Sequence, residues 1–242
     1  MHSLFISDLH LCESRPEITS SFIEFIKHTA SQAEALYILG DFFEYWVGDD
    51  DLTNPTHAPI IKALRQLSDS GTKLFVMHGN RDFLIGIDFC DASGAILLVD
   101  PILISIYGKP TLLSHGDALC TDDVAYIEFR KEVRTASWIN AFLAQPLASR
   151  HALVKQLREQ SEVAKSEKSV AIMDVNQSAV NQLFRDFNYP TTLIHGHTHR
   201  PATHYLSVDN KAVARYVLGD WYEQGSYLQV DADGITAYNL ES

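Results

Sequence analysis

Short apolar runs alternate with segments of helical spacing along the first half of the chain. The predicted strands there are 4–7, 35–39 and 73–77, each only four or five residues long. Between them, segments 20–31 and 59–71 carry apolar residues three or four positions apart, and the second ends at Gly71. This strand–helix–strand order predicts parallel strands covered by helices, and therefore an α/β architecture.

The pattern changes in the second half, where helical spacing alone continues from Asp122 to about Asn188. The helical segments are 124–134, 138–148, 152–164 and 178–187. Further strands are predicted at 95–99, 102–107 and 111–114 before this region, and at 191–195, 214–221, 226–231 and 235–240 after it. We therefore expect a core formed by 1–121 and 189–242, interrupted by a helical insertion at 122–188.

Polar side chains follow five of the predicted strands directly. In "LIHGHTHRPATH" (193–204) histidines recur at every second residue, so His197 and His199 can converge on one point past the strand end. The complete set of strand-end candidates is Asp8, His10, Asp41, Asn80, His115, His197 and His199. Because ligands bind at the carboxyl ends of strands in an α/β sheet, we expect these side chains to share one rim.

The residue types in this set favour divalent cations. Carboxylate and amide oxygens suit hard cations, while imidazole suits Mn, Fe, Zn or Ni. Seven ligands exceed the needs of one tetrahedral zinc but serve two metals that share a bridging carboxylate. Two cations roughly 3.5–4 Å apart promote in-line displacement at phosphorus. Any single strand-end motif, such as Asp8 with His10, is also typical of an ordinary turn. The hypothesis of a metal site therefore depends on the joint occurrence of all these motifs.

Composition excludes several classes of protein. A chain of 242 residues, 46% apolar and 21% charged, is globular and fits one large domain or a domain with an insertion. It contains no run of about 18 apolar residues and no secretory signal at its start, so we expect a cytoplasmic protein. Cys12, Cys90 and Cys120 form no CxxC pair, so reduced thiols are expected and a cysteine zinc site is not.

The net charge of −12 argues against broad nucleic-acid binding, because no extended basic face is evident. Two interpretations of the acidic excess stay open. The carboxylates can simply form a solvated surface, or many of them can be gathered around bound cations.

The motifs "DLH", "GDFFE", "GNRD", "HGD" and "GHTH", in this order over about residues 4–200, resemble those of the calcineurin-like metallophosphoesterase superfamily. The resemblance implies a β-sandwich flanked by helices. It implies one metal held by Asp8, His10, Asp41 and His199, and a second held by Asp41, Asn80, His115 and His197, with Asp41 bridging. His195 is not among the implied ligands, and a structural role beside them is expected.

Arg81 departs from many members of the superfamily, which carry a histidine after the asparagine of the third motif. Arginine presents a fixed fork of donors to phosphate oxygens and stays charged. A salt bridge to neighbouring Asp82 is the structural alternative. The resemblance implies catalytic roles for Asp41, Asn80, Arg81 and His115.

The longer stretches "DLHLC", "ILGDFFEYWVGDDD", "HGNRDFL", "HGDALCTDD" and "SVAIMDVNQ" resemble the UDP-2,3-diacylglucosamine pyrophosphohydrolase family of Gram-negative lipid A biosynthesis. The resemblance implies hydrolysis at the α-phosphorus, giving UMP and 2,3-diacylglucosamine 1-phosphate (lipid X), with two Mn2+ ions. It implies peripheral association with the cytoplasmic face of the inner membrane, a glycolipid nucleotide substrate, and neither nucleic acid nor an obligate protein partner.

The same resemblance implies a set of substrate contacts. These are Asn80, Arg81, Asp123, Ser161, Lys165, Lys168 and His197. Lys165 stands where relatives commonly carry asparagine. Lysine can donate a hydrogen bond but cannot accept one, so the implied contact changes in kind.

The helical insertion offers apolar residues interspersed with cations. They are Trp138, Ile139, Phe142, Leu143 and Leu147 with Arg150, Lys155 and Arg158. This combination suits acyl chains and anionic headgroups, although the same residues can serve only to pack the insertion onto the core. Two other functions are open: the same site acting on a soluble nucleotide or phosphoprotein, and a scaffold with this fold and no activity.

Overall fold

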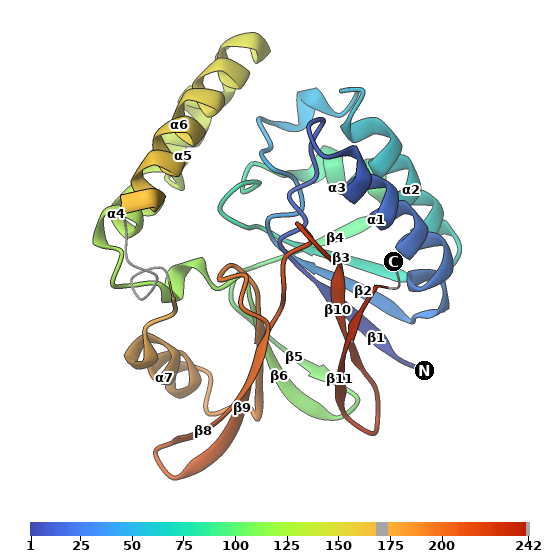
Figure 1. Cartoon of the computed structure of the whole chain (residues 1–242), viewed down its shortest axis with the longest axis vertical. Helices are drawn as coiled ribbons and strands as arrows, with labels where there is room; N and C mark the ends of the chain where they lie inside the picture. Colours follow the sequence, from blue (N-terminus) through green and yellow to red (C-terminus); the bar gives the residue numbers. More distant parts are fainter. Residues whose placement is uncertain (168–173, 241–242) are drawn as a thin grey trace.

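The computed structural model describes residues 1–167 and 174–240, except for the side chains of 159–167. Its core consists of two mixed β-sheets (Figure 1). The first has the order β11-β10-β1-β2-β3-β4, with β1 Ser3–Ile6, β2 Ala35–Leu39, β3 Lys73–Met77, β4 Ala95–Leu98, β10 Ser226–Val230 and β11 Ile235–Asn239. The second has the order β5-β6-β7-β9-β8, with β5 Ile102–Ile106, β6 Lys109–Ser114, β7 Thr192–His195, β8 Ala202–Val208 and β9 Lys211–Val217.

Parallel pairing dominates the centre of both sheets. Strands β1, β2, β3 and β4 are parallel neighbours, and so are β6, β7 and β9. The parallel arrangement predicted from the strand–helix–strand order is confirmed. Because parallel strands end on the same side of a sheet, the residues that follow β1, β2 and β3 reach one edge.

The two sheets face each other across a buried apolar layer. Phe5, Leu39 and Met77 of the first sheet contribute to this layer, together with Leu113 and Ile194 of the second. On the outer face of the first sheet pack α1 (Pro16–His28), α2 (His57–Asp69) and α3 (Ile87–Ser93). Helix α7 (Gln177–Asp186) packs on the second sheet through two of its side chains, Val180 and Phe184. The layers therefore follow the order helix, sheet, sheet, helix.

Three further helices stand beside the sandwich, namely α4 (Val124–Val133), α5 (Ala136–Leu143) and α6 (Leu147–Glu167) (Figure 1). The pattern at 138–148 predicted one continuous helix, and this was wrong. The chain instead ends α5 and restarts as α6 around Pro146, because proline lacks the backbone N–H of a helix interior and clashes with the preceding turn. In the described part of the chain, no helix is both long and apolar enough to cross a membrane.

Two elements were not predicted. Helix α3 has only seven residues, too few to show a clear period. Strand β8 lies at the edge of its sheet and is largely exposed, so its sequence "ATHYLSV" lacks an apolar run. Both elements are stabilised by their neighbours rather than by a strong local pattern.

Candidate metal centre

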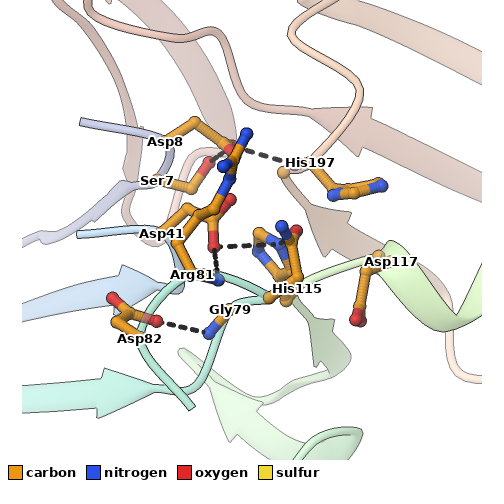
Figure 2. Close-up of polar contacts among 12 residues, drawn as sticks. Ser7, Asp8, Asp41, Gly79, Arg81, Asp82, His115, Asp117 and His197 are labelled. Atoms are coloured by element: carbon orange, nitrogen blue, oxygen red, sulfur yellow. Dashed lines mark hydrogen bonds and ion pairs between the residues drawn. The ribbon is translucent and has the colours of Figure 1, made fainter. Parts of the chain in front are cut away.

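Side chains from strand ends of both sheets form two adjoining groups of potential metal ligands. The first group is Asp8, His10 and His199, and the second is Asp41, His115 and His197. Within each group the ligand atoms all lie within 4.8 Å of one another. Figure 2 shows Asp8, Asp41, His115 and His197 gathered where their strands end. The two histidines of "GHTH" converge on this region but enter different groups.

Asp41 lies between the two groups. Its Oδ2 is 3.8 Å from His10 Nε2, and its Oδ1 is 3.7 Å from His115 Nε2. Asn80 joins the second group, because its Oδ1 is 3.1 Å from the same His115 nitrogen. The structure thus brings together all seven strand-end side chains singled out in the sequence, with one carboxylate facing both groups.

An unusual backbone conformation accompanies these positions. Asp8, His10, Asp41, His197 and His199 all have positive φ, between 49° and 68°. Non-glycine residues rarely adopt this left-handed region, although Asp and His are among the more tolerant types. Such strain persists only where surrounding contacts enforce it, and it concentrates at functional sites. Here it turns each side chain sharply out of its strand end towards the centre.

Two glycines allow the strand ends to approach one another this closely. A Cβ atom at Gly79 would lie 2.1 Å from Asp41 Oδ1, and one at Gly196 would lie 2.3 Å from Asp8 Oδ2. Neither carboxylate could keep its place beside a larger residue. The glycines of "HGN" and "HGH" are therefore required by packing against the two carboxylates.

Hydrogen bonds fix both carboxylates. Ser7 Oγ and the His197 backbone N–H donate to Asp8 Oδ2 at 2.6 and 2.9 Å (Figure 2). The other oxygen, Asp8 Oδ1, is buried and lies 3.3 Å from His199 Nε2, a ligand atom of the same group. The Arg81 backbone N–H donates to Asp41 Oδ1 at 2.8 Å. A buried, oriented carboxylate oxygen that faces an imidazole nitrogen of the same group is suited to share a cation with it.

The neighbouring loops are held by Asp82. Its Oδ2 accepts from the Phe42 backbone N–H at 2.7 Å, and its Oδ1 accepts from the Gly79 N–H at 2.8 Å. Asp82 therefore ties the loop after β2 to the loop after β3. This is a structural role different from the salt bridge to Arg81 considered above.

The electrostatics of the centre show how much charge is concentrated there. Burial and the nearby carboxylates Asp82 and Asp8 raise the pKa of Asp41 to about 6, against the opposing effect of His115. Burial disfavours the charged form of His115, but Asp41, Asp8 and Asp117 outweigh it and raise its pKa to about 9. Divalent cations would compensate the crowded carboxylates, and the mixed oxygen and nitrogen donors fit two such ions of the Mn, Fe or Zn type.

Sequence reasoning missed two acidic residues beside the centre. Asp220 Oδ2 lies 2.9 Å from His199 Nδ1, and this contact orients the ring and fixes which nitrogen faces the first group. Asp117 is fully buried and accepts from Tyr126 Oη at 2.5 Å and Arg130 Nε at 2.7 Å, which attaches α4 to the centre. "GDW" after β9 repeats the "GD" that follows β2, and this signal could have identified Asp220.

His195 has a different environment from the ligand histidines. It is fully buried, with Nδ1 2.9 Å from the Gly196 carbonyl oxygen and Nε2 3.1 Å from Arg215 Nη1. Burial lowers its pKa to about 4, so the ring is neutral, donates to the carbonyl and accepts from the arginine. Both nitrogens are thus occupied by the protein.

The residues implied as substrate contacts are distributed unevenly. Asn80, Arg81 and His197 lie at the metal centre. Asp123 caps α4, where its side chain accepts from the Tyr126 backbone N–H at 3.2 Å. The side chains of Ser161 and Lys165 on α6, and the whole of Lys168, lie outside the described residues.

An apolar cavity of about 350 Å3 adjoins the centre. Its polar lining includes Glu44, Asn80, Arg81 and Arg158. Its apolar walls include Phe83, Trp138 and Phe142. Trp138 stacks on Phe142 with ring centroids 4.9 Å apart, and the ring centroids of Phe83 and Trp138 are 6.1 Å apart. Helices α4, α5 and α6 all contribute to the lining, so the cavity lies between the core and these helices.

Comparison with known proteins gives consistent results. The family described as calcineurin-like phosphoesterase matches residues 1–201. A UDP-2,3-diacylglucosamine hydrolase of Pseudomonas fluorescens (strain SBW25) is 51% identical over 232 residues, covering 96% of this chain and 92% of the relative. One of Cellvibrio japonicus is 46% identical over 241 residues, covering all of both chains. The solved structure of vacuolar protein sorting 29 from Cryptosporidium parvum shares the fold, with a TM-score of 0.53 at 13% identity over 100% of this chain and 92% of that one.

Proposed function

This chain belongs to the calcineurin-like phosphoesterase family, and from that premise we propose that it hydrolyses the pyrophosphate bond of UDP-2,3-diacylglucosamine. The products are UMP and 2,3-diacylglucosamine 1-phosphate (lipid X). Nearly full-length relatives with this name, about half identical in sequence, support the substrate. The observation that carries the proposal is an apolar cavity that adjoins a centre of two candidate metal sites, because such a pair suits a substrate with a phosphate and fatty chains.

Two divalent cations are the proposed cofactors, and family resemblance favours Mn2+. Asp8, His10, Asp41 and His199 would hold one ion, and Asp41, Asn80, His115 and His197 the other. When bound, such a pair lowers the pKa of a water molecule and neutralises charge on phosphate oxygens. The protein contributes the rigid placement of the ligands, through the strained backbone and the hydrogen bonds to both carboxylates.

The remaining catalytic contribution comes from side chains that face the phosphates. Arg81 offers a permanently charged guanidinium at the junction of the metal centre and the cavity, where negative charge develops during hydrolysis. The amide group of Asn80 can hold an oxygen beside it. Asp123, Ser161, Lys165, Lys168 and His197 are proposed as further contacts to the sugar, phosphates or nucleotide, on the basis of family resemblance.

The segment 122–188 is proposed as the insertion that forms the lipid cleft, with 1–121 and 189–242 as the metallophosphoesterase core. Helices α4–α6 line the cavity and exclude water from the acyl chains. A two-tailed glycolipid resides in a bilayer, so we propose peripheral association with the cytoplasmic face of the inner membrane. No obligate protein partner is required by this mechanism.

The test is direct. The purified protein, loaded with Mn2+, is incubated with UDP-2,3-diacylglucosamine in detergent micelles, and release of UMP is measured. Release of UMP supports the proposal. Its absence with both metals verified by elemental analysis contradicts it. UDP-N-acetylglucosamine, which lacks long acyl chains, should be a poor substrate, and efficient turnover of it would favour a soluble nucleotide instead.

The role of Asp41 is tested by Asp41→Ala. One change removes a carboxylate that faces both ligand groups, so turnover should fall by roughly 10^3-fold or more, as when a group acting on the transition state is removed. Arg185→Met is the matched surface control, since Arg185 pairs with Asp209 away from the site. Near-normal turnover of Asp41→Ala would refute a shared role.

A further inference from the structure

Asp117 receives three side chains from helix α4 and its C-terminal cap. Tyr126, Arg130 and Arg134 are four positions apart, so they form one stripe along the helix. Tyr126 Oη donates to Asp117 Oδ2 at 2.5 Å, and Arg130 Nε donates to the same oxygen at 2.7 Å. Arg134 Nη2 reaches this oxygen at 3.4 Å and donates to the Gly79 backbone oxygen at 2.8 Å. A single carboxylate thus holds about two turns of the helix.

Asp117 itself belongs to the rigid core. It follows His115 by two residues and is fully buried. His115 Nδ1 lies 2.9 Å from the Leu39 backbone oxygen, and this contact ties the segment to β2. Figure 2 shows Asp117 on the other side of His115 from Asp41. Asp117 therefore holds the helix from a fixed point beside the metal centre and is a member of neither ligand group.

A second stripe of α4 lines the apolar cavity. Its members are Ala125, Phe129 and Val133, each one position before a residue that contacts Asp117. Successive residues of a helix are about 100° apart around its axis, so the two stripes are neighbours. A rotation of α4 by that angle would turn the apolar stripe out of the cavity. The cavity wall therefore depends on how α4 is rotated about its axis.

Tyr126 connects the two stripes to the metal centre. Its hydroxyl donates to Asp117, its side chain lines the cavity, and its ring centroid lies 6.0 Å from that of His197 at an interplanar angle of 26°. The end of the cavity that adjoins the metal centre is thus formed by a residue that Asp117 holds directly.

We propose that Asp117 is a positioning residue that sets the rotation of α4, and thereby the cavity wall that meets the acyl chains of the substrate. The inference rests on the function proposed above, which places those chains in this cavity. Hydrogen bonds between a buried carboxylate and guanidinium groups are strong and directional, so they fix one orientation of the helix. Their loss should weaken binding of the acyl chains and leave the reaction at the metal centre unchanged.

Arg130 provides the variant for testing this role. Arg130 pairs with Asp117 and is not part of the cavity lining, whereas Tyr126 lines the cavity and Arg134 also contacts the loop of Gly79. Arg130→Met removes the charged donor but keeps a long apolar side chain with a similar helix propensity. Arg130→Lys restores the charge. Because Asp117 is close to His115, metal content is measured for every variant.

The experiment compares two substrates with the same headgroup. One is UDP-2,3-diacylglucosamine with long acyl chains, and the other carries short acyl chains. For Arg130→Met, KM on the long-chain substrate should rise about tenfold, as expected for loss of a charged hydrogen bond, while kcat should stay within about twofold. KM on the short-chain substrate should change by less than about twofold, because short chains make few contacts with α4. Arg130→Lys should recover part of the loss, and Arg185→Met should behave as wild type.

A double variant tests whether Arg130 acts through Asp117. In the Asp117→Ala background, Arg130→Met should cause no further rise in KM on the long-chain substrate, because the carboxylate is already absent. A full additional rise would show that Arg130 acts independently of Asp117 and would contradict the inference.

An unchanged KM on the long-chain substrate, equal rises on both substrates, or losses that follow reduced metal content would also overturn the inference. Failure of the wild type to release UMP would instead count against the proposed function. Hydrogen exchange, which needs no substrate, keeps the two apart. The amides of α4 should exchange about tenfold faster in Arg130→Met, while those of β1, β2 and β3 stay as in the wild type. Unchanged exchange in α4 would contradict the role of Asp117.

Discussion

Arg150 of α6 donates to Asp50 of the core through both arms of its guanidinium, with Nη1 2.8 Å from Oδ1. The arginine is only 2% exposed, although its partner is largely solvated. The same guanidinium donates to the Val47 backbone oxygen, and its Nε donates to the Gln145 oxygen. These bonds attach the N-terminal end of α6 to the loop after β2, which also carries Asp41. The same loop therefore supports both a helix that lines the cavity and a residue of the metal centre.

Replacing Arg150 should weaken the attachment of α6 to the core and lower the stability of the fold. Arg150→Met leaves two carbonyl oxygens and a carboxylate without their donor, and we expect a loss of about 1–3 kcal/mol in the free energy of unfolding. Urea denaturation at pH 7 measures it, with Arg65→Gln as the control, since Arg65 pairs with Asp69 on the exposed surface of α2. Equal stability of the wild type and Arg150→Met would show that the buried pair contributes nothing.

The ion pair of Arg150 with Asp50 predicts how the stability of the fold depends on pH. A hydrogen bond from Arg150 lowers the pKa of Asp50 below its usual value. A carboxylate with a lowered folded-state pKa stabilises the protein fully above its unfolded value of about 3.9, and this stabilisation is lost as the pH falls further. The loss in the free energy of unfolding of Asp50→Asn, relative to the wild type, should therefore be constant from pH 8 to 5 and shrink below pH 4. A stability difference between the wild type and Asp50→Asn that grows as the pH falls would contradict the prediction.

Asp220 should control metal affinity without being a ligand. It orients His199 through Nδ1, so Asp220→Asn should weaken binding to the first ligand group by about 10–100-fold. Titration of the metal-free protein with Mn2+ measures this, and Asp233→Asn, an exposed carboxylate in the turn before β11, is the control. If both variants bind as the wild type does, the contact to His199 has no functional role.

Gly79 tests the close packing at the centre. An added methyl group would collide with Asp41 Oδ1, so Gly79→Ala should displace the carboxylate that faces both groups and lower turnover by about 100-fold or more. Gly108→Ala separates steric from backbone effects, because Gly108 has φ 80° but nothing within 4 Å of its Cβ position. That control should lose stability and keep turnover. Normal turnover of Gly79→Ala would show that the loop after β3 can shift to accommodate the methyl group without displacing Asp41.

Removal of metal should destabilise the fold. Without cations, the buried Asp8 and Asp41 are compensated only by neighbouring histidines such as His115, whose pKa they raise to about 9. A ligand that binds only the native state contributes about 4 kcal/mol at a concentration 1,000 times its Kd. Treatment with EDTA should therefore lower Tm by several degrees, and added Mn2+ should restore it. An unchanged Tm, with metal loss verified, would mean that these side chains bind no structural ion.

The three thiols should differ in reactivity. Cys12 is partly exposed, and although burial opposes ionisation, hydrogen bonds from Ser14 and Arg15 lower its pKa. Cys90 and Cys120 are buried, and burial raises the pKa of Cys120 to about 12. In the folded protein, DTNB should label one thiol rapidly, and Cys12→Ser should abolish that phase. Rapid reaction of two or more thiols would contradict this packing.

The sequence predicts most of the sheet framework and the position of the centre. Strand-end residues such as Asp8 and Asp41 were recognisable because parallel strands bring their carboxyl ends to one edge. Asp220 follows β9 in the same way, and its "GD" signal was present but not used. Its contact with His199 depends on a side-chain distance between separate elements, and no local pattern encodes such a distance.

Helix α7 differs from α4, α5 and α6 because Val180 and Phe184 are embedded in the apolar layer against the second sheet. Exchange of the proposed cleft segment between relatives would test whether that segment sets the substrate preference. A chimera joined after α7 would import a foreign surface against β6 and β7, whereas one joined between α6 and α7 would leave that contact native. The choice of junction thus determines whether such a hybrid retains a well-packed scaffold.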